Sequence, residues 1–128
     1  MIEECLFCNK KKQKIIFSSE LLFVVRDSYP VTKLHTLIIP HRHVSNFFEL
    51  NDNELNNLNK ILKKQRESLL NLDKKITGFN IGINAGKDAG QSIMHCHIHL
   101  IPRRKGDIEN PQGGVRGVIP SKQKYNNK

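Results

Sequence analysis

Three histidines stand at every second position of the segment MHCHIHLIPRR, which covers residues 94–104. They are His95, His97 and His99, half of the six histidines in the chain. Because imidazole titrates near neutral pH, such a group can bind a metal ion, attack an electrophile or transfer protons. A helix would scatter side chains at this spacing, whereas a strand places all three on one face. We therefore expect a strand over 93–102 whose intervening apolar side chains face the core.

A glycine-rich loop, AGKDAGQS, directly precedes the histidines. Glycine lets backbone N–H groups approach a ligand closely, and successive N–H groups can bind an anion. Gly90 supplies this freedom, and Asn84, Gln91 and Ser92 add polar side chains. A glycine-rich turn alone is most often only a turn. Followed by the histidines, it predicts a phosphate-binding loop beside a nucleophile.

Two of the three cysteines, Cys5 and Cys8, form a C-x-x-C pair near the start of the chain. Such a pair supplies half of a tetrahedral zinc site, so two more ligands would have to come from distant residues. A reduced, metal-free pair is the alternative. A redox pair is disfavoured because no strand–motif–helix order of the thioredoxin kind surrounds it. Cys96, among the histidines, is expected to pack as a small apolar residue.

Strands and one helix must position these groups. Apolar runs predict strands over 20–27, 34–40 and 79–84, besides the histidine strand. The connection between the last two strands is too short for a parallel crossover, which favours an antiparallel sheet. The sequence thus predicts an α+β fold.

Leucines at helical spacing predict one long helix over 52–72, started by the cap-type residues NDNE. A short helix is expected just before it, and Gly78 is expected to end the helical region. The leucine stripe is interpreted as core packing. It consists of Leu55, Leu58, Leu62, Leu69 and Leu72.

The composition is that of one ordinary globular domain. The chain has 128 residues, of which 38% are hydrophobic and 26% charged. It contains no apolar run of about 18 residues and no apolar signal core, so we expect a cytoplasmic protein without a membrane span. The net charge of +9 favours phosphorylated small molecules or nucleic acids as partners, although lysine is also a common solubilising residue.

The C-terminal segment has no helical period and is rich in Gly, Pro and Lys. We expect a domain over 1–104, followed by a basic, extended tail over 105–128 that packs on the domain or on a dimer partner. The cations of the tail could contact a polyphosphate or a nucleic-acid end, or could simply be solvated.

The stretch AGQSIMHCHIHLIPR is similar to the signature of the histidine triad (HIT) superfamily, in which three histidines alternate with apolar residues after Gly-Gln-Ser. The stretch RDSYPVTKLHTLIIPHRHVSN resembles a second block of that family. CLFC resembles the zinc-bearing bacterial branch, whose members are Hint-like or diadenosine polyphosphate hydrolase-like. The resemblance covers about residues 5–104.

The resemblance implies a fold, an activity and an assembly. The fold is a five-stranded antiparallel sheet with one long helix, usually in a homodimer. The activity is that of a nucleotidyl hydrolase or transferase, of phosphoramidase or diadenosine polyphosphate hydrolase type. It cleaves at the α-phosphate of adenylylated or dinucleoside polyphosphate substrates through a covalent nucleotidyl-histidine intermediate. The alternative is a zinc-stabilised nucleotide- or nucleic-acid-binding module with little turnover; nucleic acid is the less favoured partner.

The resemblance also implies residue roles. His97 is the nucleophile and His99 contacts the bridging or leaving-group atom. Ser92, Gln91 and Asn84 hold the phosphate and the leaving group, Asp27 binds the ribose hydroxyls, and apolar side chains flank the base. The implied catalytic residues are His97, His99, Ser92 and Gln91. The implied nucleotide-binding residues are Asp27, Asn84, Gly90, Leu6 and Phe7.

For the metal, the resemblance implies a structural Zn²⁺ with four protein ligands, drawn from both ends of the domain. His41 is a rival to His43 for one position, and the family spacing favours His43. His35 is expected to be an orienting or buried, hydrogen-bonded histidine. The implied zinc ligands are Cys5, Cys8, His43 and His95.

Overall fold

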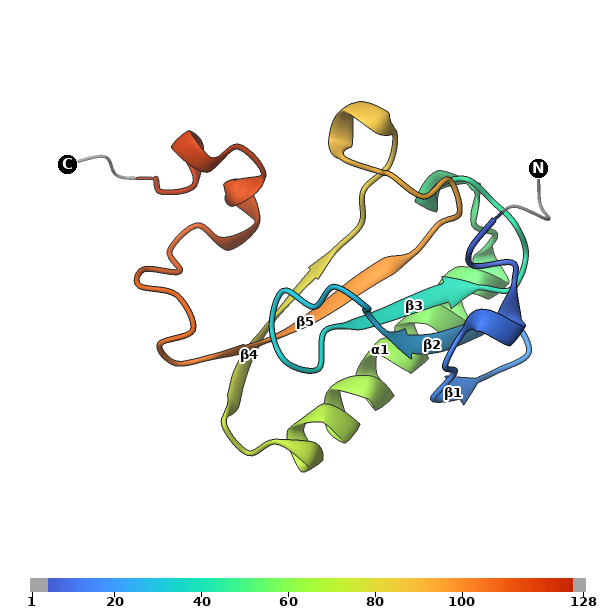
Figure 1. The fold of residues 1–128 in the computed structure, drawn as a ribbon, viewed down its shortest axis with the longest axis horizontal. Helices are drawn as coiled ribbons and strands as arrows, with labels where there is room; N and C mark the ends of the chain where they lie inside the picture. Colours follow the sequence, from blue (N-terminus) through green and yellow to red (C-terminus); the bar gives the residue numbers. More distant parts are fainter. Residues whose placement is uncertain (1–4, 126–128) are drawn as a thin grey trace.

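A computed structural model describes residues 5–125, so the outermost residues of both expected segments lie outside the described range. The fold is a five-stranded sheet with one long helix, and each pair of neighbouring strands is antiparallel (Figure 1). This confirms the α+β expectation. The strand order is β1-β2-β3-β5-β4, with β1 Phe17–Ser18, β2 Leu22–Arg26, β3 Thr36–Pro40, β4 Ile76–Gly82 and β5 Ile98–Arg104.

The helix α1 covers Asp52–Leu72, as the leucine spacing predicts. It begins with a capping box, in which the Asn51 side chain accepts from the Glu54 N–H and the Glu54 side chain accepts from the Asn51 N–H. The prediction for Leu72 was wrong, because its side chain is 64% exposed and the buried stripe ends at Leu69. The expected short helix is the 3₁₀ helix η3, Phe47–Glu49.

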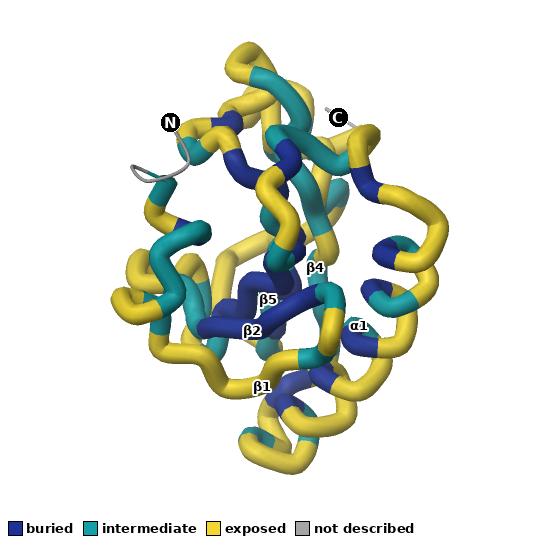
Figure 2. The backbone as a smooth tube through the Cα atoms, turned by 90° about the vertical axis from the view of Figure 1, so that its right-hand side faces the viewer, coloured by how far each residue is buried: buried dark blue, intermediate teal, exposed yellow. Residues whose placement is uncertain are grey.

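The two faces of the sheet carry different layers, because side chains alternate along β2, β3 and β5. One face packs against α1 through Leu22, Val24, Ile38 and Ile98. The other face packs Phe23, Val25, Leu37 and Ile39 around Phe7 of the N-terminal segment. Figure 2 shows the buried residues along β2 and on the inner turns of α1.

The starts of β4 and β5 differ most from the prediction. β5 begins at Ile98, so His95 and His97 precede the ladder; there the N–H of Cys96 donates to the Val44 carbonyl, 2.8 Å away, outside the sheet. β4 begins at Ile76, so Gly78 lies inside a strand and does not end the helix. In both cases the boundary depends on which backbone partner lies opposite, and local sequence does not encode that partner.

After β5 the chain turns back towards β4 (Figure 1). It forms two short 3₁₀ helices, η5 at Gly114–Val118 and η6 at Pro120–Lys122, and a Cβ on Gly114 would lie 3.3 Å from the Asn80 side chain. Among residues 5–125, no helix is long and apolar enough to cross a membrane.

Candidate active site and metal centre

A cavity of about 370 Å³ opens on the sheet face opposite α1. The β2–β3 hairpin, the N-terminal segment, the glycine-rich loop and the histidine segment all contribute to its walls. The cavity brings together most of the side chains to which the family resemblance gives roles in catalysis and nucleotide binding. These are Leu6, Phe7, Asp27, Asn84, Gly90, Ser92, His97 and His99.

One backbone carbonyl sets the protonation of His97. Its Nδ1 lies 2.8 Å from the carbonyl oxygen of His95, and a carbonyl oxygen can only accept. Nδ1 therefore donates, so Nε2 of the neutral ring holds a lone pair. A nucleophilic imidazole requires this tautomer, because the lone pair on Nε2 makes the attack. The His97 ring also packs against Phe7, with ring centroids 5.1 Å apart.

A chain of hydrogen bonds fixes His99 in turn. The N–H of Val31 donates to Nδ1 of His35, 3.0 Å away, so the His35 proton lies on Nε2. That Nε2 lies 2.9 Å from Nδ1 of His99, which therefore accepts. The His99 proton is then on Nε2. Asp27 lies at the edge of this chain, with Oδ2 3.5 Å from His35 Nε2.

Burial keeps both of these rings neutral near pH 7. It lowers the pKa of His99 to about 4, and the neighbouring His97 and His35 lower it further. Burial also lowers the pKa of His35, against a smaller opposing effect of Asp27. A neutral His99 with its proton on Nε2 can donate a hydrogen bond to a departing group.

Asp27, His35 and His99 could also be considered as a second metal site, since their donor atoms all lie within 4.8 Å of one another. The hydrogen bonds argue against this. A metal would need the lone pair of His35 Nε2, but Nδ1 of that ring already accepts from the Val31 N–H. The geometry therefore favours a hydrogen-bonded chain.

Leu34 explains how His35 reaches its buried position. With φ of +73° it is the one non-glycine residue among 5–125 in the left-handed region, and it directly precedes His35. Its side chain packs against the cluster of Leu69, Ile76 and Leu100, which holds this unfavourable conformation in place. No local sequence pattern signals this strain.

In the glycine-rich loop, two glycines have a positive backbone φ angle, which other residues rarely adopt: Gly86 at +98° and Gly90 at +95°. Gln91 braces the loop from behind. The Gln91 side chain accepts from the Gly86 N–H at 2.9 Å, and its amide nitrogen donates to the carbonyls of Ser45 and Ile93. Gln91 is 4% exposed and does not line the cavity. The Gln91 side chain thus supports the loop, and its expected contact with phosphate stays a prediction.

The four expected metal ligands meet beside the cavity. His95 Nδ1 lies 3.3 Å from Cys5 Sγ, 3.5 Å from Cys8 Sγ and 3.0 Å from His43 Nδ1. Cys8 Sγ lies 3.1 Å from His43 Nδ1. A tetrahedral zinc ion with bonds of about 2.0–2.3 Å needs donors about 3.3–3.8 Å apart. The cluster can therefore hold a metal ion of this size with little movement.

The groups around the ligands favour metal binding. His95 Nε2 donates to the Pro40 carbonyl at 2.8 Å, which leaves Nδ1 free to face the two sulfur atoms. Burial lowers the pKa of His95, which keeps the ring in the neutral form that a metal needs. His41, the rival ligand, lies elsewhere: its Nε2 is 3.1 Å from Ser18 Oγ.

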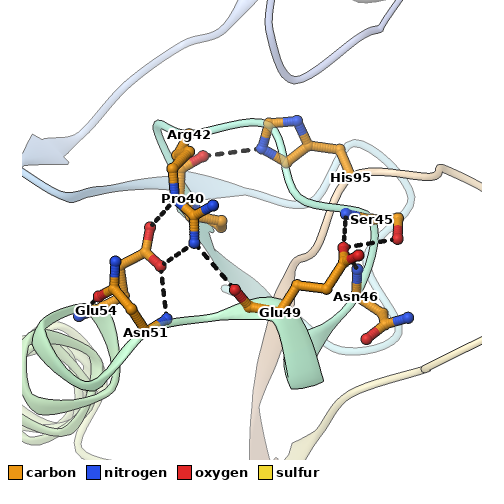
Figure 3. Close-up of polar contacts among 8 residues, drawn as sticks. All are labelled: Pro40, Arg42, Ser45, Asn46, Glu49, Asn51, Glu54 and His95. Carbon is orange, nitrogen blue, oxygen red and sulfur yellow. Dashed lines mark hydrogen bonds and ion pairs between the residues drawn. The ribbon is translucent and has the colours of Figure 1, made fainter.

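An ion pair anchors the loop that carries His43 (Figure 3). Arg42 Nη2 donates to the buried Glu54 carboxylate at 2.8 Å and to the Glu49 carbonyl at 3.0 Å. On the other side of His43, the Ser45 N–H donates to Glu49 Oε1 at 2.7 Å. Sequence reasoning missed this network; the capping position of Glu54 was visible, but its pairing with Arg42 was not.

Comparison with known proteins agrees with this geometry. The HIT domain family matches residues 9–106. An uncharacterized HIT-like protein of Methanocaldococcus jannaschii is 38% identical over 109 residues, 82% of this chain and 83% of that protein. The bis(5'-adenosyl)-triphosphatase of Dictyostelium discoideum is 37% identical over 101 residues, 78% of this chain and 66% of that protein. The crystal structure of a Zn-bound histidine triad family protein from Mycobacterium smegmatis gives a TM-score of 0.75 at 28% identity, covering 84% of this chain and 80% of that chain.

Proposed function

This chain belongs to the HIT family, and we propose that it is a nucleotidyl hydrolase or transferase in which His97 attacks the α-phosphorus of a nucleotide. The observation that carries the proposal is the His97 ring itself. Its Nδ1 is committed to the His95 carbonyl, and the ring lines the cavity. Support also comes from the Dictyostelium relative, whose name describes an enzyme acting on bis(5'-adenosyl) triphosphate.

The nucleoside half of the substrate occupies the inner part of the cavity. Leu6 and Phe7 supply apolar contacts for the base, and Val25 and Leu37 extend that surface. The carboxylate of Asp27 accepts hydrogen bonds from the ribose hydroxyls. These contacts hold the α-phosphorus near His97 before reaction, which lowers the entropic cost of attack.

The reaction proceeds in two displacements. Nε2 of His97 forms a bond to the α-phosphorus while the bond to the leaving group breaks. The His99 Nε2–H donates a hydrogen bond to the leaving group, which takes its proton from solvent. Water then attacks the phosphorus of the nucleotidyl-imidazole and its proton passes to solvent, while the P–N bond breaks and releases the nucleotide and free His97. Backbone N–H groups of the loop around Gly90 and the Ser92 hydroxyl stabilise the charge on the phosphoryl oxygens.

The leaving group lies in a second groove of about 500 Å³ that adjoins the cavity at His35, Asn84 and His99. Residues of β4 and η5 form its outer wall. Among residues 5–125, no lysine, arginine, aspartate or glutamate lines this groove. A polyphosphate leaving group would need cations. The proposal therefore ranks nucleoside phosphoramidates and other adenylylated compounds above dinucleoside polyphosphates.

Zinc is the metal that two thiolates and two imidazoles in a tetrahedral arrangement favour. Cys5, Cys8, His43 and His95 would hold it. Four protein ligands leave no open coordination position, so the ion holds the N-terminal segment in place and does not activate water. Thiolate ligands remain reduced in a reducing compartment, which is consistent with a cytoplasmic location. Zinc content measured on protein purified without chelators tests the metal.

A homodimer is part of the same proposal. Exposed apolar side chains lie where the C-terminal tail meets β4: Ile81 is 52% exposed, Val115 60% and Val118 76%. A second copy that covers them would also close the groove over the leaving group. Sedimentation velocity distinguishes the dimer from the monomer that would contradict this part of the proposal.

A substrate panel tests the activity. The panel contains adenosine phosphoramidates, diadenosine tri- and tetraphosphate and an adenylylated oligonucleotide, each tested with wild type, His97→Ala and the control His41→Ala. His97→Ala should lose about 10³-fold or more in kcat while keeping its AMP affinity, since only the nucleophile is removed. His41→Ala should match wild type, because His41 lies outside the cavity.

The panel also separates the proposed enzyme from a binding module. A wild-type protein that binds AMP or the oligonucleotide but turns over no substrate would contradict the hydrolase. Affinity for the oligonucleotide that falls steeply with salt would then favour a nucleic-acid binder, as the net charge of +9 allows.

A further inference from the structure

We propose that metal occupancy of the Cys5, Cys8, His43 and His95 cluster sets the affinity of the neighbouring cavity for nucleotides. The segment that the metal would fix is itself one wall of that cavity. The inference rests on the proposed function, since it concerns the nucleotide that this function assigns to the cavity.

The wall is built from the residues that surround the two cysteines. Leu6 and Phe7 are the two residues between Cys5 and Cys8, and both line the cavity. Lys12 and Gln13 follow and line it as well. The Gln13 side chain donates to the Leu6 carbonyl at 2.8 Å, which ties the two parts of the wall together. A shift of the cysteines would therefore move the whole wall.

Few contacts other than the metal donors tie this segment to the sheet. The backbone N–H groups of Cys8, Asn9 and Gln13 all donate to carbonyls within the segment 5–13. Across to the sheet, Phe7 is buried in the apolar cluster around Phe23, and the Lys10 ammonium lies 5.5 Å from the Phe23 ring centroid. Metal bonds to His43 and His95 would add the covalent-strength links that these contacts lack.

Without a metal, the side chains of the cluster attach the segment 5–13 only weakly to the rest of the domain. A thiol is a weak hydrogen-bond donor, so Cys5 and Cys8 without metal give little attachment to the two imidazoles. Leu6 is already 47% exposed, and its carbonyl accepts only from Asn9 and Gln13 of the same segment, among the described residues. Loss of the metal should therefore release Leu6 and the residues that follow it.

The effect should be local to the cavity. The core between the sheet and α1 contains no residue of the segment 5–13. The metal-free protein should thus keep its helix and sheet. The catalytic face would still respond, because Phe7 packs against both His95 and His97, with ring centroids 5.9 Å and 5.1 Å apart. Metal occupancy then changes the nucleotide site without unfolding the domain.

Equilibrium binding of AMP, measured by calorimetry, tests the inference independently of turnover. Wild type is measured zinc-loaded, after treatment with a chelator, and after zinc is added back. Cys8→Ser is measured beside the matched control Cys96→Ala, which removes the one cysteine outside the cluster. Helix content is followed by circular dichroism, and the segment by trypsin cleavage after Lys10, Lys11, Lys12 and Lys14.

We expect the AMP dissociation constant to rise at least about tenfold in chelated wild type and in Cys8→Ser, with helix content retained and faster cleavage of the segment. Zinc should restore affinity to wild type, and Cys96→Ala should bind as wild type does. If Cys8→Ser unfolds, a zinc titration of wild type gives the same test, since affinity must follow occupancy.

An AMP affinity that is the same with and without metal, in folded protein, would overturn the inference. That result leaves the proposed hydrolase standing, because turnover by His97 is measured separately. Conversely, metal-dependent AMP binding without turnover of any substrate would contradict the hydrolase and support the inference.

Discussion

Single backbone groups decide the chemistry of the histidines. The His95 carbonyl fixes the proton of His97, the Pro40 carbonyl fixes that of His95, and the Val31 N–H fixes that of His35. The placement of the three histidines on one face could be predicted from the sequence, because the alternation of side chains in an extended segment is a local property. The sequence could not predict these tautomers, since two of the three partners depend on how a loop or hairpin folds back.

The His99 ring gives a pH prediction for stability. Its pKa is about 4 in the folded protein and near the ordinary 6.5 when unfolded. Between these values the unfolded chain binds a proton that the folded protein does not, so stability present above about pH 6.5 is lost as the pH falls towards 4. This amounts to about 3 kcal/mol.

Urea unfolding at about pH 7 and about pH 4.5 measures the loss. His99→Asn should lose less stability over this range than wild type, because the substituted residue does not titrate. Burial also lowers the pKa of His35 and His95, so part of the loss should remain. Equal losses in the variant and in wild type would contradict the assignment to His99.

At the scale of elements, the helix was predictable and the strand ends were not. Asn51 and Glu54 cap α1 locally, so its start could be predicted from the sequence. β5 starts five residues later than its apolar pattern suggests, because the Cys96 N–H binds the Val44 carbonyl instead of a strand. The sequence predicted a phosphate-binding loop between β4 and β5. It did not predict that Gln91 supports this loop, because that role depends on a bond to Ser45, which is far away in the sequence.

A comparison of Gly82 and Gly90 measures the cost of a left-handed backbone without any contribution from crowding. A Cβ at Gly90 or at Gly82 would meet no atom within 4 Å, but only Gly90 has a left-handed backbone, at φ +95°. Gly90→Ala should therefore destabilise the protein by about 1–2 kcal/mol and disturb the glycine-rich loop. Gly82→Ala should be neutral or mildly stabilising. Thermal unfolding of both variants measures the difference, and equal effects would contradict this account of the loop.

In the whole molecule, the two faces of the sheet have different roles: one packs against the helix, and the other carries the candidate site. The helix α1 packs on one face, while the cavity, the candidate metal site and the N-terminal segment share the other. The family resemblance anticipated that both ends of the domain meet at the cluster of Cys5, Cys8, His43 and His95. Composition alone predicted only one globular domain and the excess of cations, because charge patterning does not specify which surfaces come together.

The net charge of +9 predicts a salt effect on catalysis. Long-range attraction should raise the rate of encounter with anionic nucleotides, and added salt screens it. Between about 50 mM and about 300 mM NaCl, kcat/KM should fall several-fold while kcat changes little. Steady-state kinetics over this range measures it, and a flat kcat/KM would mean that the cations serve solubility alone.

The proposed reaction requires His97, the middle histidine, to form a bond to the nucleotide. The most direct measurement is rapid quenching of a reaction with an adenylylated substrate, followed by mass spectrometry of the peptide that contains residues 94–104. We expect one acid-labile adenylyl group on His97 in wild type and none in His97→Ala. Turnover with no such adduct, or an adduct on His99, would contradict it.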